Sequence, residues 1–181
     1  MWVTFLLVQI RILEGKYEEA MKMLSDEPAN VFDNQFTFLP KPQIMATIYR
    51  LQNKNNLAKE YYDSARVVIE NKLKELPDDT RLYSALGLVL AGLGKKDEAI
   101  REGKRGTELL PITKEAWRGF TRELDLAKIY TMVGEYDLAI EKIDYLLSIP
   151  GELSVPYIKL DPVWRPLLKI PRFQKVLEKY K

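Results

Sequence analysis

The chain has 181 residues, 46% of them hydrophobic, and its 28 basic residues nearly balance 26 acidic ones. This near-neutral charge argues against nucleic acid as a partner. The sequence contains no Cys and no His, which excludes disulfides, His-based catalytic triads and nearly all zinc and haem sites. We therefore expect no enzymatic activity, no cofactor and no metal, and the lack of Cys fits a cytoplasmic location.

The first predicted helix, residues 1–13, is apolar on almost every side. It lacks a basic leader and a cleavage site, and it is shorter than the ~20 residues that a membrane-spanning helix needs. An outermost helix should carry one polar face. We therefore expect the chain to be a fragment of a longer protein, or to form a homodimer through this helix. The candidate dimer interface comprises Trp2, Phe5, Leu6 and Ile10.

Four alanines recur in similar sequence contexts, at intervals of 38, 41 and 40 residues: Ala20, Ala58, Ala99 and Ala139. A fixed period of this size is typical of stacked repeats. Each alanine falls in the second of two amphipathic helices, and mostly small residues stand twelve positions before it, in the first helix: Val8, Ala46, Gly87 and Ala127. We predict helical hairpins at residues 1–27, 40–77, 80–111 and 113–150.

The turn within each hairpin has its own signature. Gly15, Gly94 and Gly134 stand where the first helix must end, and Asn53 replaces glycine in the second repeat. Glycine, and after it asparagine, best accepts the left-handed conformation that closes a helix. These four positions are therefore predicted to be left-handed helix ends.

The second helices end at prolines, and Pro77 comes later in its repeat than Pro111 and Pro150 do in theirs. The second helix of the second repeat should thus be longer than its counterparts by about two turns. Gly103 and Gly106 fall inside the third such helix, where each glycine should cost ~1 kcal/mol relative to alanine. We attribute these glycines to the close approach of a bulky neighbour, with a local hinge as the alternative.

Two segments break the repeat pattern. The proline-rich and asparagine-rich stretch 25–42 is predicted to be a long loop, either folded back onto the repeats or exposed as a hydrophobic contact site. Residues 151–181 are predicted to form capping helices, with one helix start at Asp161–Pro162 and another at Pro171. The cap carries an excess of basic residues, which we interpret as a solvated surface, with an anion-binding patch as the alternative.

Residues 1–150 resemble the tetratricopeptide repeat family. The third repeat carries the family's residues in order: Tyr83, Leu86, Gly87, Leu90, Gly94, Ala99 and Pro111. The resemblance implies an all-α, right-handed solenoid of about four hairpins with a short helical C-terminal cap. It also implies a protein–protein interaction module or scaffold whose concave groove binds a peptide or a partner domain.

The C-terminal part has a second resemblance. The segments 127–134, 146–150, 160–168 and 171–173 resemble the C-terminal repeats of bacterial multidomain signalling proteins. In those proteins the repeats follow a kinase, cyclase or DNA-binding domain. The resemblance implies a docking or sensory tail.

In the resembled family the first helices line the concave face, which places the candidate partner-binding residues there. By helical phase they are Gln9, Leu13, Gln43, Thr47, Arg50, Arg81, Ser84, Leu88, Leu124 and Lys128. Of these, Arg50, Arg81 and Lys128 are expected to pair with carboxylates of a bound peptide. Three alternatives to groove binding remain: self-association through the first helix, a nucleic-acid binder of helical-repeat design, and an enzyme, which would need a deep pocket with converging carboxylates or lysines.

Overall fold

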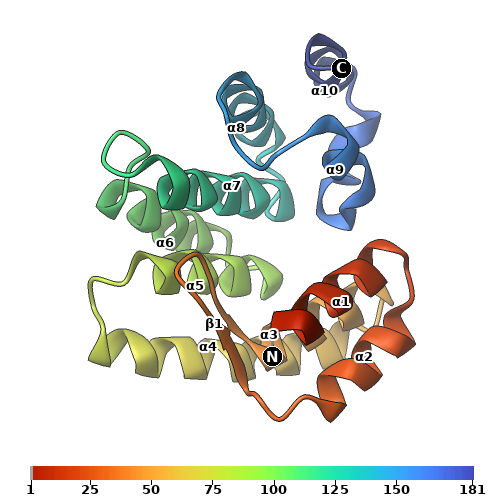
Figure 1. Cartoon of the computed structure of the whole chain (residues 1–181), viewed down its shortest axis with the longest axis vertical. Coiled ribbons are helices and arrows are strands. Elements are labelled where there is room, and N and C mark those ends of the chain that lie inside the picture. The colour runs from red at the N-terminus through yellow and green to blue at the C-terminus, as the bar shows by residue number, and fades with distance from the viewer. Residues whose placement is uncertain (1) are drawn as a thin grey trace.

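The computed structural model describes residues 2–181, so Met1, with which the predicted first repeat begins, lies outside it. The described chain is mostly helical (Figure 1). The long helices are α1 (Trp2–Leu13), α2 (Tyr17–Asp26), α3 (Lys41–Leu51), α4 (Asn55–Glu75), α5 (Thr80–Gly92), α6 (Lys96–Leu109), α7 (Ala116–Met132) and α8 (Tyr136–Ser148). Two short strands, β1 (Val31–Asp33) and β2 (Phe38–Pro40), precede α3. The C-terminal elements are α9 (Val155–Leu160), the 3-10 turns η1 (Pro162–Trp164) and η2 (Leu167–Lys169), and α10 (Pro171–Lys179).

Consecutive helices pack in pairs, α1 with α2, α3 with α4, α5 with α6 and α7 with α8. Neighbouring pairs contact one another through α4 and α5, and through α6 and α7, while α5 also packs directly against α7. The first helices of the last two pairs thus lie side by side. None of the helices in residues 2–181 is long and apolar enough to cross a membrane.

The four predicted helix ends are left-handed. Gly15, Gly94 and Gly134 have φ angles of 76°, 77° and 82°, and Asn53 has a φ of 60°. The amide of the residue after each of them donates to a carbonyl five residues earlier, as from Lys95 N to Leu90 O at 2.9 Å. This bond closes the helix end in the Schellman manner. The turn prediction is confirmed in all four repeats.

Small residues lie where helices meet. Ala20, Ala99 and Ala139 are fully buried. A Cβ atom on Gly103 would lie 2.6 Å from Ile129 Cδ1, on α7. The predicted close approach of a bulky neighbour is therefore confirmed at Gly103, whereas Gly106 faces the small side chain of Ser84 and the backbone of Thr80. The helix α6 runs through both glycines without interruption. The helix α4 has 21 residues against 14 in α6, which confirms its predicted extra length.

The stretch 25–42 contains the main departure from the sequence-based expectation. Rather than a long loop throughout, it includes the end of α2 and the antiparallel hairpin β1–β2, in which Phe32 pairs with Leu39. The side chains of Phe32 and Phe38 are buried. The Oδ1 atom of Asn34 accepts hydrogen bonds from the Phe36 and Thr37 amides at 2.7 and 2.8 Å, which closes the tip. The segment does fold back onto the helices, as the first alternative proposed.

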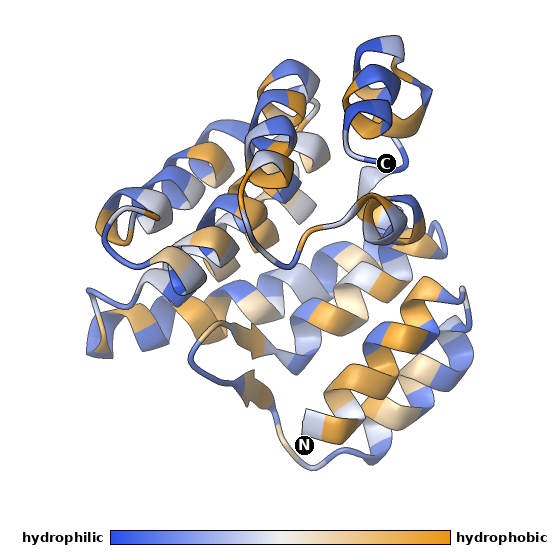
Figure 2. Ribbon diagram, turned by 45° about the horizontal axis from the view of Figure 1, so that its top comes forward, coloured by the Kyte–Doolittle hydropathy of each residue, from blue (hydrophilic) through white to orange (hydrophobic). Residues whose placement is uncertain are grey.

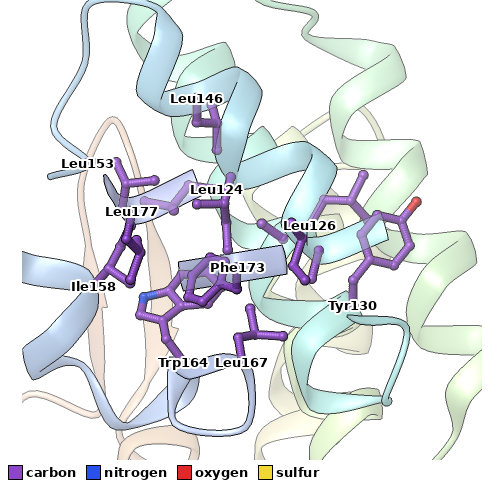
Figure 3. Packing of buried hydrophobic residues seen from close by; sticks show 14 of the residues in the cluster. Leu124, Leu126, Tyr130, Leu146, Leu153, Ile158, Trp164, Leu167, Phe173 and Leu177 are labelled. Atoms are coloured by element: carbon purple, nitrogen blue, oxygen red, sulfur yellow. The ribbon is translucent and has the colours of Figure 1, made fainter. Parts of the chain in front are cut away.

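The C-terminal elements cover α7 and α8 (Figure 3). Trp164, Leu167 and Phe173 are fully buried in a cluster that includes Leu124 of α7 and Leu146 of α8. The carboxylate of Asp161 accepts from the Val163 amide at 3.0 Å and so starts η1. Both predicted starts are confirmed, whereas the short helix α9 was not predicted.

Candidate functional site

A hollow with a volume of about 510 Å³ lies among the helices of the described chain. Side chains of α1, α3, α5 and α7 line it, together with the hairpin strand β2 and the segment from Glu152 to Val163. Figure 1 shows α9 of that segment on the same side of the molecule as α1. We refer to this hollow as the central cavity.

Nine of the ten predicted groove residues line the central cavity: Gln9, Leu13, Gln43, Thr47, Arg50, Arg81, Leu88, Leu124 and Lys128. Ser84 is the exception. It is only 2% exposed and faces α6, where a Cβ on Gly106 would lie 3.1 Å from its Oγ atom. Ser84 therefore belongs to the α5–α6 contact.

Part of the wall of the central cavity was not predicted from the sequence. The hairpin contributes Phe38 and Leu39, and the C-terminal segment contributes Glu152, Tyr157 and Asp161. The apolar residues in stretch 25–42 were the available signal for the hairpin. Nothing in the repeat pattern could place the C-terminal acids, because the period ends before them.

Much of the wall is apolar. On one side, Phe5 and Leu6 of α1 lie near Leu39 of the hairpin and Ile44 of α3. Such a surface favours a ligand with an apolar body, and a few polar groups must then fix its orientation.

Helix α3 supplies three polar side chains to the wall, at intervals of four and three residues that place them on one helix face: Gln43, Thr47 and Arg50. The hydroxyl of Thr47 donates to Gln43 O at 3.0 Å and lies 3.3 Å from the Tyr62 hydroxyl. In contrast, Gln43 Oε1 and Arg50 Nε are buried, and neither has a hydrogen-bond partner within residues 2–181. Buried polar atoms normally have partners, so these two call for an explanation.

The guanidinium of Arg81 is already engaged. It contacts Asp79 Oδ2 and Asp33 Oδ1, each at 2.6 Å, and it also donates to the Asn34 carbonyl. The hydrogen bond to Asp79 is the main cause that raises the pKa of Arg81 above its usual value. Arg81 thus ties the hairpin to the start of α5.

Lys128 lies in an acidic environment. Burial by itself would lower the pKa of this half-buried lysine, but the charges of Tyr157, Asp161, Asp125 and Glu152 outweigh it and raise the pKa. Tyr157 is uncharged at neutral pH, since its own pKa is raised above the usual value, so the C-terminal segment brings two charged groups to Lys128, Asp161 and Glu152. Lys128 therefore attracts that segment electrostatically toward α7.

Arg122 is a buried cation that sequence reasoning did not single out. It is 1% exposed, lies 3.4 Å from Asp125 Oδ2 and donates to the carbonyl of Phe36 at the hairpin tip. Burial lowers the pKa of its guanidinium, against the effect of Asp125 and Asp79. The ring of Phe36 also lies 6.1 Å from that of Trp117, between centroids. The hairpin tip is therefore held on α7 as well as α5.

The outer face of α1 is apolar and exposed, as Figure 2 shows in the helix next to the N-terminus. Of the predicted dimer residues, Leu6 and Ile10 are exposed, by 59% and 45%. Trp2 and Phe5 instead pack on Phe32 of the hairpin, with Phe5 at 5.5 Å between ring centroids. Val3 and Leu7 complete the exposed face.

Basic residues of the C-terminal cap are partly paired. Arg172 contacts Asp137 and Glu141 of α8 at 2.7 and 3.1 Å, and Lys179 contacts Asp144 at 3.0 Å. These ion pairs hold α10 on α8 and reduce the positive charge that α10 offers to an anionic partner.

Comparison with known proteins adds no family assignment. No protein-family model matches the chain, and a search of curated proteins finds no match. Within residues 2–181, no group of three or more carboxylates is arranged to hold a metal ion.

Proposed function

We propose that this chain is a right-handed solenoid of tetratricopeptide-like hairpins that binds a short peptide of another protein in the central cavity. The single observation that carries the proposal is the pair of buried, unpartnered polar atoms, Gln43 Oε1 and Arg50 Nε, in a largely apolar wall. A peptide offers both apolar side chains and hydrogen-bonding groups. It could therefore satisfy these atoms while covering the apolar wall.

The size of the cavity favours a short segment over a partner domain. A volume of about 510 Å³ lies within the ~300–1,000 Å³ typical of pockets for small ligands. The hairpin and the C-terminal segment occupy space that an open groove would leave for a larger partner. Binding a domain would require both to move.

In this role the chain binds its peptide and carries out no reaction on it. In a longer signalling protein, as the second resemblance implies, such a module would act as a cytoplasmic docking or sensory tail. Its rigid walls would select the peptide by shape, since a pre-organised site loses less entropy on binding.

A cavity-filling variant tests this function. Leu88→Trp places a large ring in the central cavity, and Leu138→Trp, at an exposed position of α8, is the matched control. Peptides would be selected on the wild-type protein from a random displayed library and then measured by fluorescence anisotropy. We expect Leu88→Trp to weaken binding at least tenfold with little change in melting temperature, and Leu138→Trp to bind as wild type does. Equal binding by all three proteins would move the site elsewhere.

A second candidate function is self-association through α1, favoured by the exposed side chains of Val3, Leu6 and Ile10. Contiguous exposed apolar surface commonly marks an interface. Light scattering over a range of concentrations would show a dimer that the double variant Leu6→Glu, Ile10→Glu abolishes. A monomer at high concentration would reject this candidate.

A further inference from the structure

The three cations predicted to anchor a ligand differ in what surrounds them. Arg81 is neutralised by Asp33 and Asp79, and Lys128 lies among the acids of the C-terminal segment. Arg50 has neither a hydrogen bond nor an ion pair from its side chain to any other residue of the described chain. The cavity thus contains one guanidinium whose charge the rest of residues 2–181 leaves uncompensated by direct contact.

The position of Arg50 makes this charge available to a ligand. It lies in the last turn of α3, on the same helix face as Gln43 and Thr47, and all three line the cavity. Its Nε atom is buried without a partner, and so is Gln43 Oε1, on a side chain that is only 5% exposed. One cationic donor and one neutral acceptor therefore lie along the same wall.

Each of these groups selects a different partner. A guanidinium pairs best with a carboxylate, because its planar set of N–H donors matches the two carboxylate oxygens. The amide oxygen of Gln43 can accept a hydrogen bond only from a donor such as a peptide N–H. Around them, Phe5, Leu39 and Ile44 present apolar surface.

We propose that the ligand is an apolar peptide that carries a single carboxylate, bound by Arg50, and donates an N–H group to Gln43. This assignment rests on the proposed peptide-binding function and specifies its ligand. A second carboxylate would find no free cation at Arg81, and near Lys128 it would meet Asp125, Glu152 and Asp161. The carboxylate belongs either to an acidic side chain or to the C-terminus of the peptide.

The test uses matched pairs of short synthetic peptides with leucine and valine at the other positions. Within each pair one position is Glu or Gln, and each peptide is made with a free or an amidated C-terminus. Affinities would be measured by calorimetry on the wild-type protein, Arg50→Gln, Arg50→Lys and the control Arg105→Gln. Arg105 is an exposed arginine of α6 outside the cavity, so its replacement changes the net charge equally.

We expect the wild-type protein and Arg105→Gln to prefer a peptide with one carboxylate over its neutral partner by about tenfold or more. Arg50→Gln should lose this preference while retaining weaker binding of the apolar body, and Arg50→Lys should restore part of it. A preference for Glu in the amidated peptides assigns the carboxylate to a side chain. A preference for the free C-terminus in the Gln peptides assigns it to the chain end.

Two results would overturn the assignment. If peptides bind and Leu88→Trp blocks them, but Arg50→Gln keeps the wild-type preference for the carboxylate, or the wild-type protein has none, the assignment fails and the proposed function stands. If no peptide of either kind binds to the wild-type protein, the proposed function fails with it.

Discussion

Gly87 lies at a three-helix contact, and its missing side chain allows that contact. A Cβ atom there would lie 2.6 Å from Ile129 Cδ1 and 3.0 Å from the backbone oxygen of Ala99. Because a backbone atom cannot rotate away, Gly87→Ala should overpack the contact and lower the free energy of unfolding by about 1–3 kcal/mol. This loss should exceed the gain of about 1 kcal/mol in helix propensity. Urea denaturation would measure it.

Gly106 provides the control for that prediction. Its nearest neighbour is the Ser84 Oγ atom at 3.1 Å, which belongs to a side chain that can adjust. Gly106→Ala should therefore cost less than Gly87→Ala. A Gly87→Ala protein at least as stable as wild type would contradict the close contact of α5 with α6.

The stabilisation that Asp79 gives to the start of α5 should depend on pH. Its carboxylate accepts from the Arg81 amide at 3.0 Å and pairs with the Arg81 guanidinium. Burial opposes ionisation, but these hydrogen bonds outweigh it and lower the pKa of Asp79 below 3.8. Because the folded pKa is depressed, the stabilisation is fully present above the ordinary carboxyl pKa and is lost as the pH falls through the lowered value.

The variant Asp79→Asn keeps a helix-capping side chain but removes the charge. At pH 7 we expect it to be less stable than wild type by about 1–3 kcal/mol. The difference should shrink as the pH falls below about 4, in denaturation curves recorded from pH 7 to pH 2. A difference that is the same at every pH would show that the ion pair with Arg81 contributes nothing.

Among the elements, α8 offers a test of which helix face the repeat pattern predicts to be buried. Ala139 is fully buried and lies in one cluster with Ala127 and Tyr130 of α7, whereas Leu138 beside it is 40% exposed. Ala139→Trp should overpack the α7–α8 contact and destabilise the protein by about 1–3 kcal/mol or more. Leu138→Trp should be nearly neutral. Thermal unfolding of both variants would decide, and equal melting temperatures would mean that the phase is wrong.

The β1–β2 hairpin changes both the enclosure of the central cavity and the charges available in it. Its tip is held by Arg81 and Arg122, and its strand β2 lines the central cavity. Two arginines that would otherwise face solvent or a ligand are thus used within the chain. The hairpin makes the central cavity more enclosed than the predicted helical hairpins alone would make it.

For the whole molecule, Lys128 connects α7 to the C-terminal segment. Lys128→Met would remove the cation that Asp161, Glu152 and Asp125 surround, although Asp125 would keep its contact with Arg122. We expect a loss of stability of about 1–3 kcal/mol at pH 7. Hydrogen exchange should rise in residues 152–163. Because the pKa of Lys128 is raised above 10.5, its contribution should be fully present at neutral pH and be lost only above that value.

Lys159→Met is the matched control, since Lys159 is an exposed lysine on α9. It should leave both stability and hydrogen exchange close to wild type. Unchanged exchange in Lys128→Met would mean that apolar packing of Trp164 and Phe173 alone holds the segment in place.

Local sequence was enough to predict the paired helices and the left-handed ends that separate the two helices of each pair. A left-handed helix end needs glycine or asparagine at one position, and an amphipathic helix needs its apolar residues on one face, so Gly94, Asn53 and the four alanines carried this information. The same phase placed nine of ten candidate residues on one cavity, because residues on one face of stacked helices must lie together. Ser84 does not line the cavity, because α5 packs on α6 at its position.

Only the tertiary structure decided which of these residues is available to a ligand. The pairing of Arg81 with Asp33, and the acids around Lys128, join groups that lie far apart in sequence and outside the repeat period. Helical periodicity predicts which way a side chain points, but not which charge arrives opposite it from a hairpin or a C-terminal segment. For that reason the sequence presents Arg50, Arg81 and Lys128 as three similar candidate anchors. Only the folded structure shows that, within residues 2–181, Arg50 is the one without an acidic partner.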